Sequence, residues 1–184
     1  MRIIAGSAKG LFLKTAAAVT RPTMDRVRAA IFSTLGDSVP GAHVLDLFAG
    51  TGAMGIEALS RGAASALFID NNAKAAALIK QNLVFTKLHG DVSTRDAFSV
   101  LNQMPEERLF DLVFADPPYA HNKEDINLAA SLLTSASLLK VMAPEALLIL
   151  ECEKKQELPE VDSLEILTDR IYGASRVLIM RAAM

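Results

Sequence analysis

The sequence has little of what builds covalent or metal-bound structure. It contains one cysteine, Cys152, and three histidines, His43, His89 and His121, in 184 residues. One cysteine cannot form an internal disulfide, and the widely separated histidines do not have the ligand spacing of zinc sites. We therefore predict a protein of the reducing cytoplasm with no metal site. Cys152 follows an apolar run and has no histidine partner evident, so we assign it to the core.

Targeting and membrane-spanning segments are also missing from the pattern. The first six residues contain no long apolar run followed by a small-residue cleavage site, which argues against a secretory signal. The most apolar stretch, residues 128–150, is interrupted by Lys140, Pro144 and Glu145 and falls short of the roughly 20 apolar residues of a spanning helix. Because 51% of the chain is hydrophobic, disorder is excluded and one main buried core is expected.

Acidic and basic residues nearly balance, but they are unevenly distributed. The net charge is −2, whereas residues 1–40 carry six basic and two acidic side chains, a net charge of +4, which leaves −6 on the rest. This asymmetry indicates a basic arm on a neutral or acidic catalytic body, although a solvated helix face without a partner would give the same count. We divide the chain into an N-terminal extension, residues 1–40, and a main domain, residues 41–184.

The extension predicts a small β-hairpin followed by a helix. Two short apolar runs within residues 2–15 flank a turn that contains glycine. Thr23 is placed to cap a helix in which apolar side chains recur at helical spacing from Val27 to Leu35. With that apolar stripe facing the body of the protein, Arg26 and Arg28 would project into solvent.

From residue 42 onward, apolar strands alternate with helical segments. We predict strands at residues 42–47, 65–69, 90–94, 110–115 and 146–151, helices at 53–60, 73–83 and 128–140, and a final hairpin of strands at 164–167 and 176–180. Alternating strands and helices that end in a hairpin are typical of an α/β fold. The pattern therefore predicts a doubly wound, seven-stranded, mostly parallel sheet with a C-terminal antiparallel hairpin.

A glycine-rich turn, Asp46 to Gly52, follows the first predicted strand. Gly50 and Gly52 let the backbone approach a ligand closely, and the helix just beyond offers free N–H groups and the positive end of its dipole. A small anionic or zwitterionic cofactor would fit there. The spacing of Gly50, Gly52 and Gly55 also satisfies the dinucleotide fingerprint, so a nicotinamide oxidoreductase remains an alternative.

Carboxylates accompany each of the first four predicted strands. Asp46, Asp70, Asp96 and Asp116 are all expected at the carboxyl ends of strands, where open α/β sheets bind ligands. Asp70 could accept hydrogen bonds from ribose hydroxyls, and Asp96 from an adenine amino group while the apolar residues after it enclose the ring. Each could instead cap a helix, but capping alone does not readily explain all four.

The sharpest signal is the run Asp116-Pro117-Pro118-Tyr119. Two prolines after a strand fix the backbone and remove sheet donors. The exocyclic amine of a base is a poor nucleophile, because its lone pair is delocalised into the ring until acceptors hold its hydrogens. The Asp116 carboxylate and the Pro117 carbonyl could be these acceptors, and Tyr119 could stack on a base taken out of its helix, with the amine in line with an electrophilic methyl. The plain alternative is a diproline turn with an incidental aromatic residue.

Together these motifs resemble those of class I S-adenosylmethionine-dependent methyltransferases that act on amino nitrogens. The N-terminal segment narrows the resemblance, because residues 2–6, Lys9-Gly10, residues 21–28 and Ile31-Phe32 are similar to those of bacterial 16S rRNA guanine-N2 methyltransferases of the RsmD type. The turn at residues 172–175 is similar to the closing hairpin of that family. The resemblance covers nearly the whole chain and implies a Rossmann-like fold.

The resemblance also implies roles for individual residues. The expected S-adenosylmethionine-binding residues are Asp46, Phe48, Ala49, Gly50, Gly52, Asp70, Asn71, Asp96 and Ala97. The residues expected to take the target guanine are Asp116, Pro117, Pro118 and Tyr119, and those expected to bind rRNA are Lys9, Arg21, Thr23, Arg26 and Arg28. Leu11, Ala29 and Asp70 depart from the family, which usually has a basic residue and two glutamates there. Leu11 removes one expected phosphate contact.

We therefore predict an enzyme that transfers the methyl group of S-adenosylmethionine to the N2 amine of a guanine in 16S rRNA, by in-line displacement and without a metal. Its partner would be the rRNA or an assembling small ribosomal subunit, bound by a monomer. The alternatives are methylation of DNA adenine or cytosine, or of protein glutamine, and a non-catalytic ribosome-assembly factor. The chain lacks a sizeable target-recognition insertion, which argues against DNA, and an oxidoreductase would leave the run at residues 116–119 unexplained.

Overall fold

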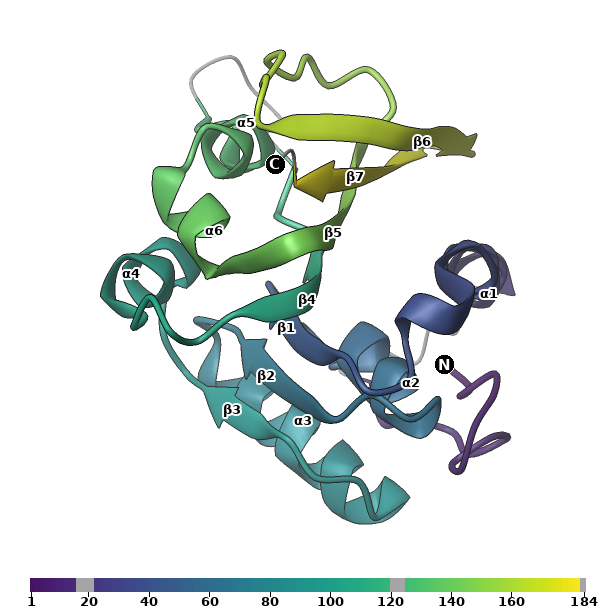
Figure 1. Ribbon diagram of the computed structural model, residues 1–184. Helices are drawn as coiled ribbons and strands as arrows, with labels where there is room; N and C mark the ends of the chain where they lie inside the picture. Colours follow the sequence, from purple (N-terminus) through teal and green to yellow (C-terminus); the bar gives the residue numbers. More distant parts are fainter. Residues whose placement is uncertain (16–21, 120–124, 183–184) are drawn as a thin grey trace.

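The computed structural model describes residues 1–15, 22–119 and 125–182, and a seven-stranded sheet lies at its centre (Figure 1). The strands are β1 (His43–Leu47), β2 (Ser65–Ile69), β3 (Asp91–Ser93), β4 (Phe110–Ala115), β5 (Met142–Glu153), β6 (Leu164–Tyr172) and β7 (Ser175–Ala182). The helices are α1 (Pro22–Leu35), the 3₁₀ turn η1 (Gly36–Ser38), α2 (Ala53–Ser60), α3 (Ala73–Thr86), α4 (Ala97–Gln103), α5 (Leu128–Leu133) and α6 (Ala136–Val141).

The strand order is β3-β2-β1-β4-β5-β7-β6. Strands β1 to β5 pair in parallel, and β7 lies antiparallel between β5 and β6. The predicted mostly parallel sheet with a terminal antiparallel hairpin is confirmed. The chain moves outward from β1 to β3 and then returns to the other side of β1 with β4, which creates a topological switch point at the carboxyl ends of β1 and β4.

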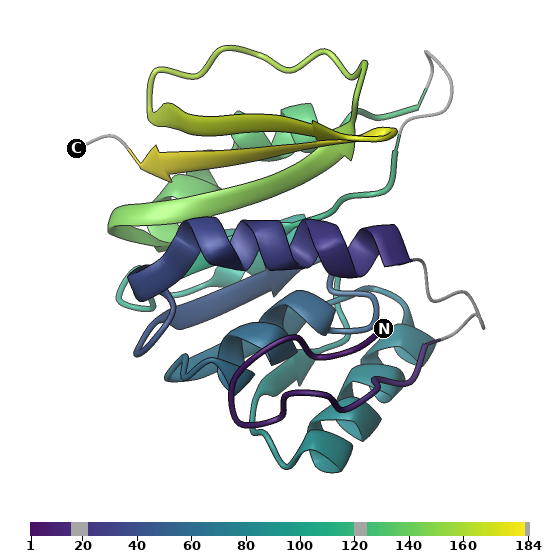
Figure 2. The same ribbon diagram turned by 90° about the vertical axis from the view of Figure 1, so that its right-hand side faces the viewer.

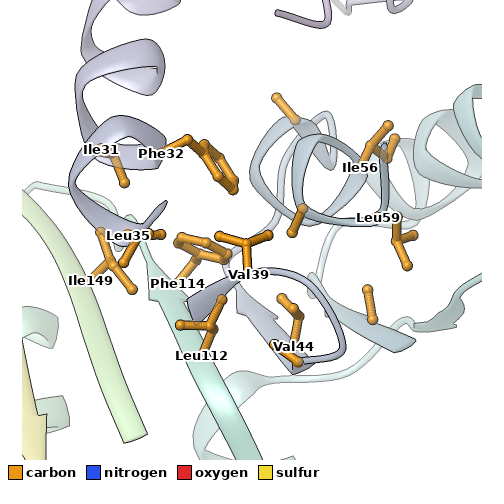
Figure 3. Packing of buried hydrophobic residues seen from close by; sticks show 14 of the residues in the cluster. Ile31, Phe32, Leu35, Val39, Val44, Ile56, Leu59, Leu112, Phe114 and Ile149 are labelled. Atoms are coloured by element: carbon orange, nitrogen blue, oxygen red, sulfur yellow. The ribbon is translucent and has the colours of Figure 1, made fainter. Parts of the chain in front are cut away.

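Two apolar clusters cover the two faces of the sheet. Alternate strand residues such as Val44 and Phe114 face α1, α2 and α3, whereas Leu45 and Val113 face α4, α5 and α6. Figure 3 shows the first cluster, in which Phe32 of α1 lies over Phe114 with 5.6 Å between ring centroids. Residues of the N-terminal extension belong to this same cluster, so the extension and the sheet share one core.

The N-terminal hairpin is less regular than predicted. Its only bridge in the described residues joins Arg2 to Phe12, supported by hydrogen bonds from Ile3 N to Leu11 O and from Gly10 N to Ile3 O, both 2.9 Å. The two predicted strands are therefore wrong in extent. The reason is that residues 4, 5, 7 and 8 direct their backbone N–H groups to Glu57 and Ser60 of α2 and not across the hairpin. The segment lies across α2 and α3 (Figure 2).

Buried polar side chains of α2 bind this segment. Glu57 is 0% exposed and accepts hydrogen bonds from the backbone N–H groups of Ile4 at 2.8 Å and Ala5 at 3.0 Å. The Ser60 hydroxyl accepts from Ala8 N at 3.0 Å. Gly6 has a φ of +82° and lies against the Ser60 carbonyl so closely that any Cβ would overlap it. The segment is therefore fixed on α2 by charge, hydrogen bonds and close backbone approach.

Several predicted boundaries differ from the structure. A short helix, α4, occupies residues 97–103, where no helix was predicted, and the single helix predicted at 128–140 is two helices, α5 and α6. Strand β5 begins at Met142, before Pro144, and not at residue 146. Each of these helices has only six or seven residues, too few for a helical period to stand out in the sequence. Within the described residues, no helix combines the length and hydrophobicity that crossing a membrane requires.

Candidate active site

Strand register brings the predicted site residues to one edge of the sheet. Leu47 is the partner of both Ile69 and Ala115, so the residues that follow β1, β2 and β4 emerge side by side. These include the glycine turn after β1, Asp70 after β2 and Asp116 after β4. The expectation that the glycine turn and residues 116–119 lie at the same edge of the sheet is confirmed.

The turn after β1 adopts a conformation that requires glycine. Gly50 and Gly52 have φ values of +55° and +75°. A Cβ on Gly52 would lie 3.1 Å from the Ile79 side chain, whereas a Cβ on Gly50 would meet nothing closer than the Phe48 carbonyl at 4.0 Å. Gly50 therefore leaves a backbone surface open to a ligand, and Gly52 is required by both its conformation and its packing.

Gly55, the third glycine of the fingerprint, has a packing role. It lies inside α2, where a Cβ would overlap the Phe68 ring of β2. Its N–H donates to Oδ2 of Asp46 at 2.9 Å. The residue thus allows close helix–sheet contact and positions a buried carboxyl group beneath the glycine turn.

Asp46 is the most perturbed acid at this edge. It is 3% exposed, and burial raises its pKa to about 8 against the effect of the Gly55 hydrogen bond, with smaller contributions from the charges of Asp116 and Asp70. Burial disfavours the charged form of a carboxyl group. In the absence of a cationic neighbour, Asp46 is therefore mainly protonated at neutral pH.

Asp70 and its neighbours hold the glycine turn from the side of β2. Oδ2 of Asp70 accepts from Gly50 N and Oδ1 accepts from Asn72 N, both at 2.8 Å. Asn72 in turn caps α3 by accepting from Lys74 N, and Asn71 is exposed beside it. Asp70 orders the turn itself, and because each carboxylate oxygen has two lone pairs it keeps acceptor capacity for ribose hydroxyls.

At the next strand, Asp96 has the capping role that the sequence left open. It is the N-cap of α4 and accepts from Ser99 N at 2.8 Å. Ala97 is buried in the core under α4, and Phe98 meets Phe48 of the glycine turn edge to face, with ring centroids 6.4 Å apart. This aromatic pair joins the glycine turn to α4 next to Asp96. An apolar wall beside an acceptor fits the predicted adenine site.

The run after β4 combines a shielded proline with polar groups that reach the surface. Pro117 is buried, Asp116 and Pro118 retain exposed surface, and the Tyr119 hydroxyl lies 3.2 Å from Oγ of Ser175. Although Asp116 reaches solvent, partial burial of its carboxyl group and then the nearby charge of Glu151 raise its pKa to about 7. Burial is also the main cause that raises the pKa of Tyr119.

Ser175 and Asn82 position other residues of the site, and the sequence analysis did not predict either of them as a site residue. Ser175 begins β7 and holds Tyr119 across the sheet edge, and its only signal was the turn that resembles the family hairpin. Asn82 is buried on α3 and accepts from Lys14 N at 2.8 Å while donating to the Thr51 carbonyl at 3.0 Å. It therefore ties the N-terminal extension to the glycine turn.

The predicted RNA-binding side chains do not all reach the surface. Lys9 and Arg26 are exposed, Arg21 lies outside the described residues, and Thr23 is the second residue of α1, so the capping position predicted for it is wrong. The Thr23 side chain is also outside the described part of the chain. Leu11, where a basic residue was expected, is exposed.

Arg28 is the clearest correction. It is 4% exposed, its guanidinium donates to the Arg2 carbonyl and to Asp25 at 2.9 Å, and its Nε lies 3.5 Å from Glu57. The prediction that it projects into solvent is wrong, because the buried carboxylate of Glu57 draws it inward. Arg28 joins α1, α2 and the N-terminal segment.

The described residues form no metal cluster, and two cavities lie away from this edge. In the part of the chain that is described, no group of three or more His, Cys, Asp or Glu residues could hold a metal ion. One cavity of about 550 Å³ lies between residues 158–166 and β7, and another of about 700 Å³ lies near residues 34–42 and 144–147. Neither is lined by the glycine turn or by residues 116–119.

The sheet order with an inserted antiparallel β7, and a ligand edge at β1, β2 and β4, define the class I methyltransferase fold. A putative methyltransferase of Escherichia coli, yhhF, has this structure with a TM-score of 0.82 at 31% identity, covering 99% of this chain and 97% of that one. The Thermus thermophilus methyltransferase RsmC shares the fold, with a TM-score of 0.73 at 19% identity over 95% of this chain and 46% of that one.

Sequence comparisons give the family. The family model described as conserved hypothetical protein 95 matches residues 1–181. The Bacillus subtilis protein named putative rRNA methyltransferase YlbH is 38% identical, with 98% of each chain covered. The Haemophilus influenzae protein named ribosomal RNA small subunit methyltransferase D is 34% identical over 94% of this chain and 89% of its own. The chain belongs to this family, which confirms the resemblance seen in the motifs.

Proposed function

We propose that this protein transfers the methyl group of S-adenosylmethionine to the N2 amine of a guanine in 16S rRNA. The observation that carries this proposal is the shared edge, where the glycine turn and Asp116-Pro117-Pro118-Tyr119 emerge from adjacent strands. Relatives that match most of the chain are named rRNA methyltransferases, and one relative is named for the small ribosomal subunit. The fold neighbour RsmC is described as a 16S rRNA N2 guanine methyltransferase in complex with AdoMet and guanosine.

The residues at the edge fit S-adenosylmethionine. The open backbone at Gly50 and the buried Asp46 beneath it would hold the methionine end, with Phe48 and Ala49 in the same turn. Asp70 and Asn71 would hold the ribose, and the wall beside Asp96 and Ala97 would hold the adenine. The bound cofactor would supply an electrophilic methyl group on a positively charged sulfur.

The residues after β4 would prepare the amine. The Asp116 carboxylate and the Pro117 carbonyl accept hydrogen bonds from the N2 hydrogens, so that the nitrogen lone pair can point at the methyl carbon. Guanine N2 forms the new N–C bond as the S–C bond breaks, and N2 then loses one proton. Because the pKa of Asp116 is raised to about 7, this carboxylate can receive that proton near neutral pH.

The aromatic side of the proposed base site depends on Tyr119. Its hydroxyl is held by Ser175, which restricts the ring while leaving its face available for stacking on a flipped base. Stacking would fix the plane of the guanine and therefore the direction of its amine. This gives Tyr119 an orienting role rather than a proton-transfer role.

We further propose that exposed basic residues of the extension contact rRNA phosphates. Lys9 and Arg26 are exposed in the described structure, and Arg21 with Thr23 completes the predicted set. Guanidinium and ammonium groups bind phosphates with little sequence selectivity. The substrate, naked rRNA or an assembling particle, would be bound by a monomer in the cytoplasm.

The direct test is methyl transfer to ribosomal RNA that lacks this modification. Purified protein would be incubated with S-adenosylmethionine and either 16S rRNA or small subunits from cells without the gene, and products would be located by primer extension and mass spectrometry. We expect one N2-methylguanine per 16S rRNA, and none with Asp116→Ala although S-adenosylhomocysteine still binds that variant. Cofactor binding without methylation of any RNA would contradict the proposal and favour an assembly factor. Full activity of Asp116→Ala would contradict the acceptor role.

A further inference from the structure

A second acid lies beside Asp116 at the candidate base site. Glu151 belongs to β5 and directly follows Leu150, the register partner of Ala115. Adjacent parallel strands are about 4.8 Å apart, and residues in register point to the same face of the sheet. Asp116, just after β4, and Glu151, within β5, therefore lie side by side on the face that α1 covers.

The Glu151 carboxylate is available to a ligand. The residue is half-buried, and no donor among the described residues makes a hydrogen bond to its side chain, in contrast to Asp46, Asp70 and Asp96. Its charge acts on both Asp116 and Tyr119, which places it within electrostatic reach of both residues. A carboxylate that keeps accessible surface and has no protein donor can accept a hydrogen bond from a ligand.

The two carboxylates match one base better than the others. The Watson–Crick edge of guanine presents two adjacent donors, N1–H and N2–H. Adenine and cytosine present an amine next to a ring nitrogen with a lone pair, which a carboxylate would repel. Two neighbouring acceptors at the base site therefore select for guanine.

We propose that Glu151 determines base specificity by accepting the N1–H of the target guanine while Asp116 accepts from N2. This inference rests on the proposed function, because it assigns the partner of the N2 amine at the same site. Glu151 touches the base but takes no part in bond making. Its role is to reject bases whose N1 position carries a lone pair.

A base analogue separates this role from general effects on catalysis. 2-Aminopurine keeps the N2 amine but has a lone pair at N1 and lacks O6. Two 16S rRNAs would be prepared by ligation, with guanine or 2-aminopurine at the nucleotide that the wild-type protein methylates, and assembled into particles if the naked RNA is not a substrate. The readout is the ratio of kcat/KM for the two RNAs, so changes that affect both equally cancel.

We expect the wild-type protein to prefer the guanine RNA by about 100-fold, because a hydrogen-bonded site rejects a base with unpaired groups. Glu151→Gln should lower this preference by about 10-fold or more, since its amide can donate to the N1 lone pair of 2-aminopurine. Glu107→Gln is the control that removes the same charge, because Glu107 is exposed before β4 at the opposite end of the strand. Its preference should equal that of the wild-type protein.

The outcomes distinguish the two hypotheses. An unchanged preference in Glu151→Gln, with S-adenosylhomocysteine still bound, would overturn the role of Glu151 and leave the methyltransferase function standing. Equal kcat/KM for the two RNAs with the wild-type protein would overturn the role of Glu151, even if Glu151→Gln failed to fold. Cofactor binding with no guanine methylation by the wild-type protein would overturn the proposed function, and the inference with it.

Discussion

Binding of the cofactor should release most of one proton from Asp46 at neutral pH. Burial raises the pKa of Asp46 to about 8, so the carboxyl group is about nine tenths protonated at pH 7 in the unliganded protein. In the proposed complex, the ammonium group of the methionine end lies beside it and favours the ionised form. If the pKa of Asp46 in the complex falls well below 7, binding releases up to about 0.9 proton at pH 7.

Calorimetry measures this number directly. S-adenosylhomocysteine would be titrated into the protein in buffers of different ionisation enthalpy, and the slope of observed enthalpy against buffer enthalpy gives the protons released. The release should fall to about 0.1 at pH 9, where an acid with a pKa of about 8 is already ionised in the unliganded protein. Because ionised Asp46 repels Asp116, Asp116 takes up part of the proton and the net number stays below one.

Asp46→Asn provides the matched control. Its side-chain carbonyl can still accept from Gly55 N, as the carboxylate does at 2.9 Å, but it has no proton to release in this pH range. Proton exchange by the ligand's own amino group is common to both proteins and cancels in the comparison. Zero release by the wild-type protein at pH 7, or equal release by both proteins, would refute the reasoning that buried Asp46 meets the cationic end of the cofactor.

Four further predictions concern other parts of the site and its support. The kcat/KM for methyl transfer should rise with pH through an apparent pKa near 7, because only ionised Asp116 accepts from the amine, and a pH-rate profile without this limb would contradict the assignment. Arg28→Ala should lower the free energy of unfolding by about 2–4 kcal/mol in denaturant titrations, because it leaves Glu57 buried with one cation fewer, and unchanged stability would argue against its structural role. Arg26→Ala should weaken RNA binding and lower the salt slope by about one without changing the melting temperature, whereas an unchanged salt slope would remove Arg26 from the interface. Gly55→Ala should destabilise the protein by more than about 1 kcal/mol, since the added methyl group would overlap the Phe68 ring of β2. An unchanged melting temperature in thermal unfolding would contradict this packing role.

Much of the sheet was predictable because its strands are short apolar runs that end in polar or glycine residues. The runs before Asp70 and Asp116, and the run that contains Asp46, are buried parallel strands, and their ends coincide with the expected ones to within a residue. Buried parallel strands need apolar side chains on both faces, since helices cover both faces of the sheet. The short helices were harder, because one or two turns contain too few apolar positions to define a period.

Residues whose roles depend on distant partners were not predictable from local pattern. By its spacing, Arg28 falls on the buried side of α1, four residues before Phe32 and seven before Leu35, and only its charge suggested exposure. Its partner Glu57 is on α2, and its other acceptor, the Arg2 carbonyl, is 26 residues away. Glu57 itself lies within an apolar run of α2 and is fully buried. The charge distribution indicated a basic N-terminal segment, but it could not show which of its arginines are buried in ion pairs.

The site could be located from motifs but not assembled from them. The turn at residues 172–175 resembles the family hairpin but does not show that Ser175 would reach Tyr119, since 56 residues separate them and the contact depends on β7 inserting between β5 and β6. The same insertion pairs Glu151 with Val177, so β5 is an interior strand. A sheet that ended at β5 would leave Tyr119 without Ser175 as its hydrogen-bond partner. The antiparallel hairpin therefore supports the candidate active site, because it supplies the serine that positions the Tyr119 ring.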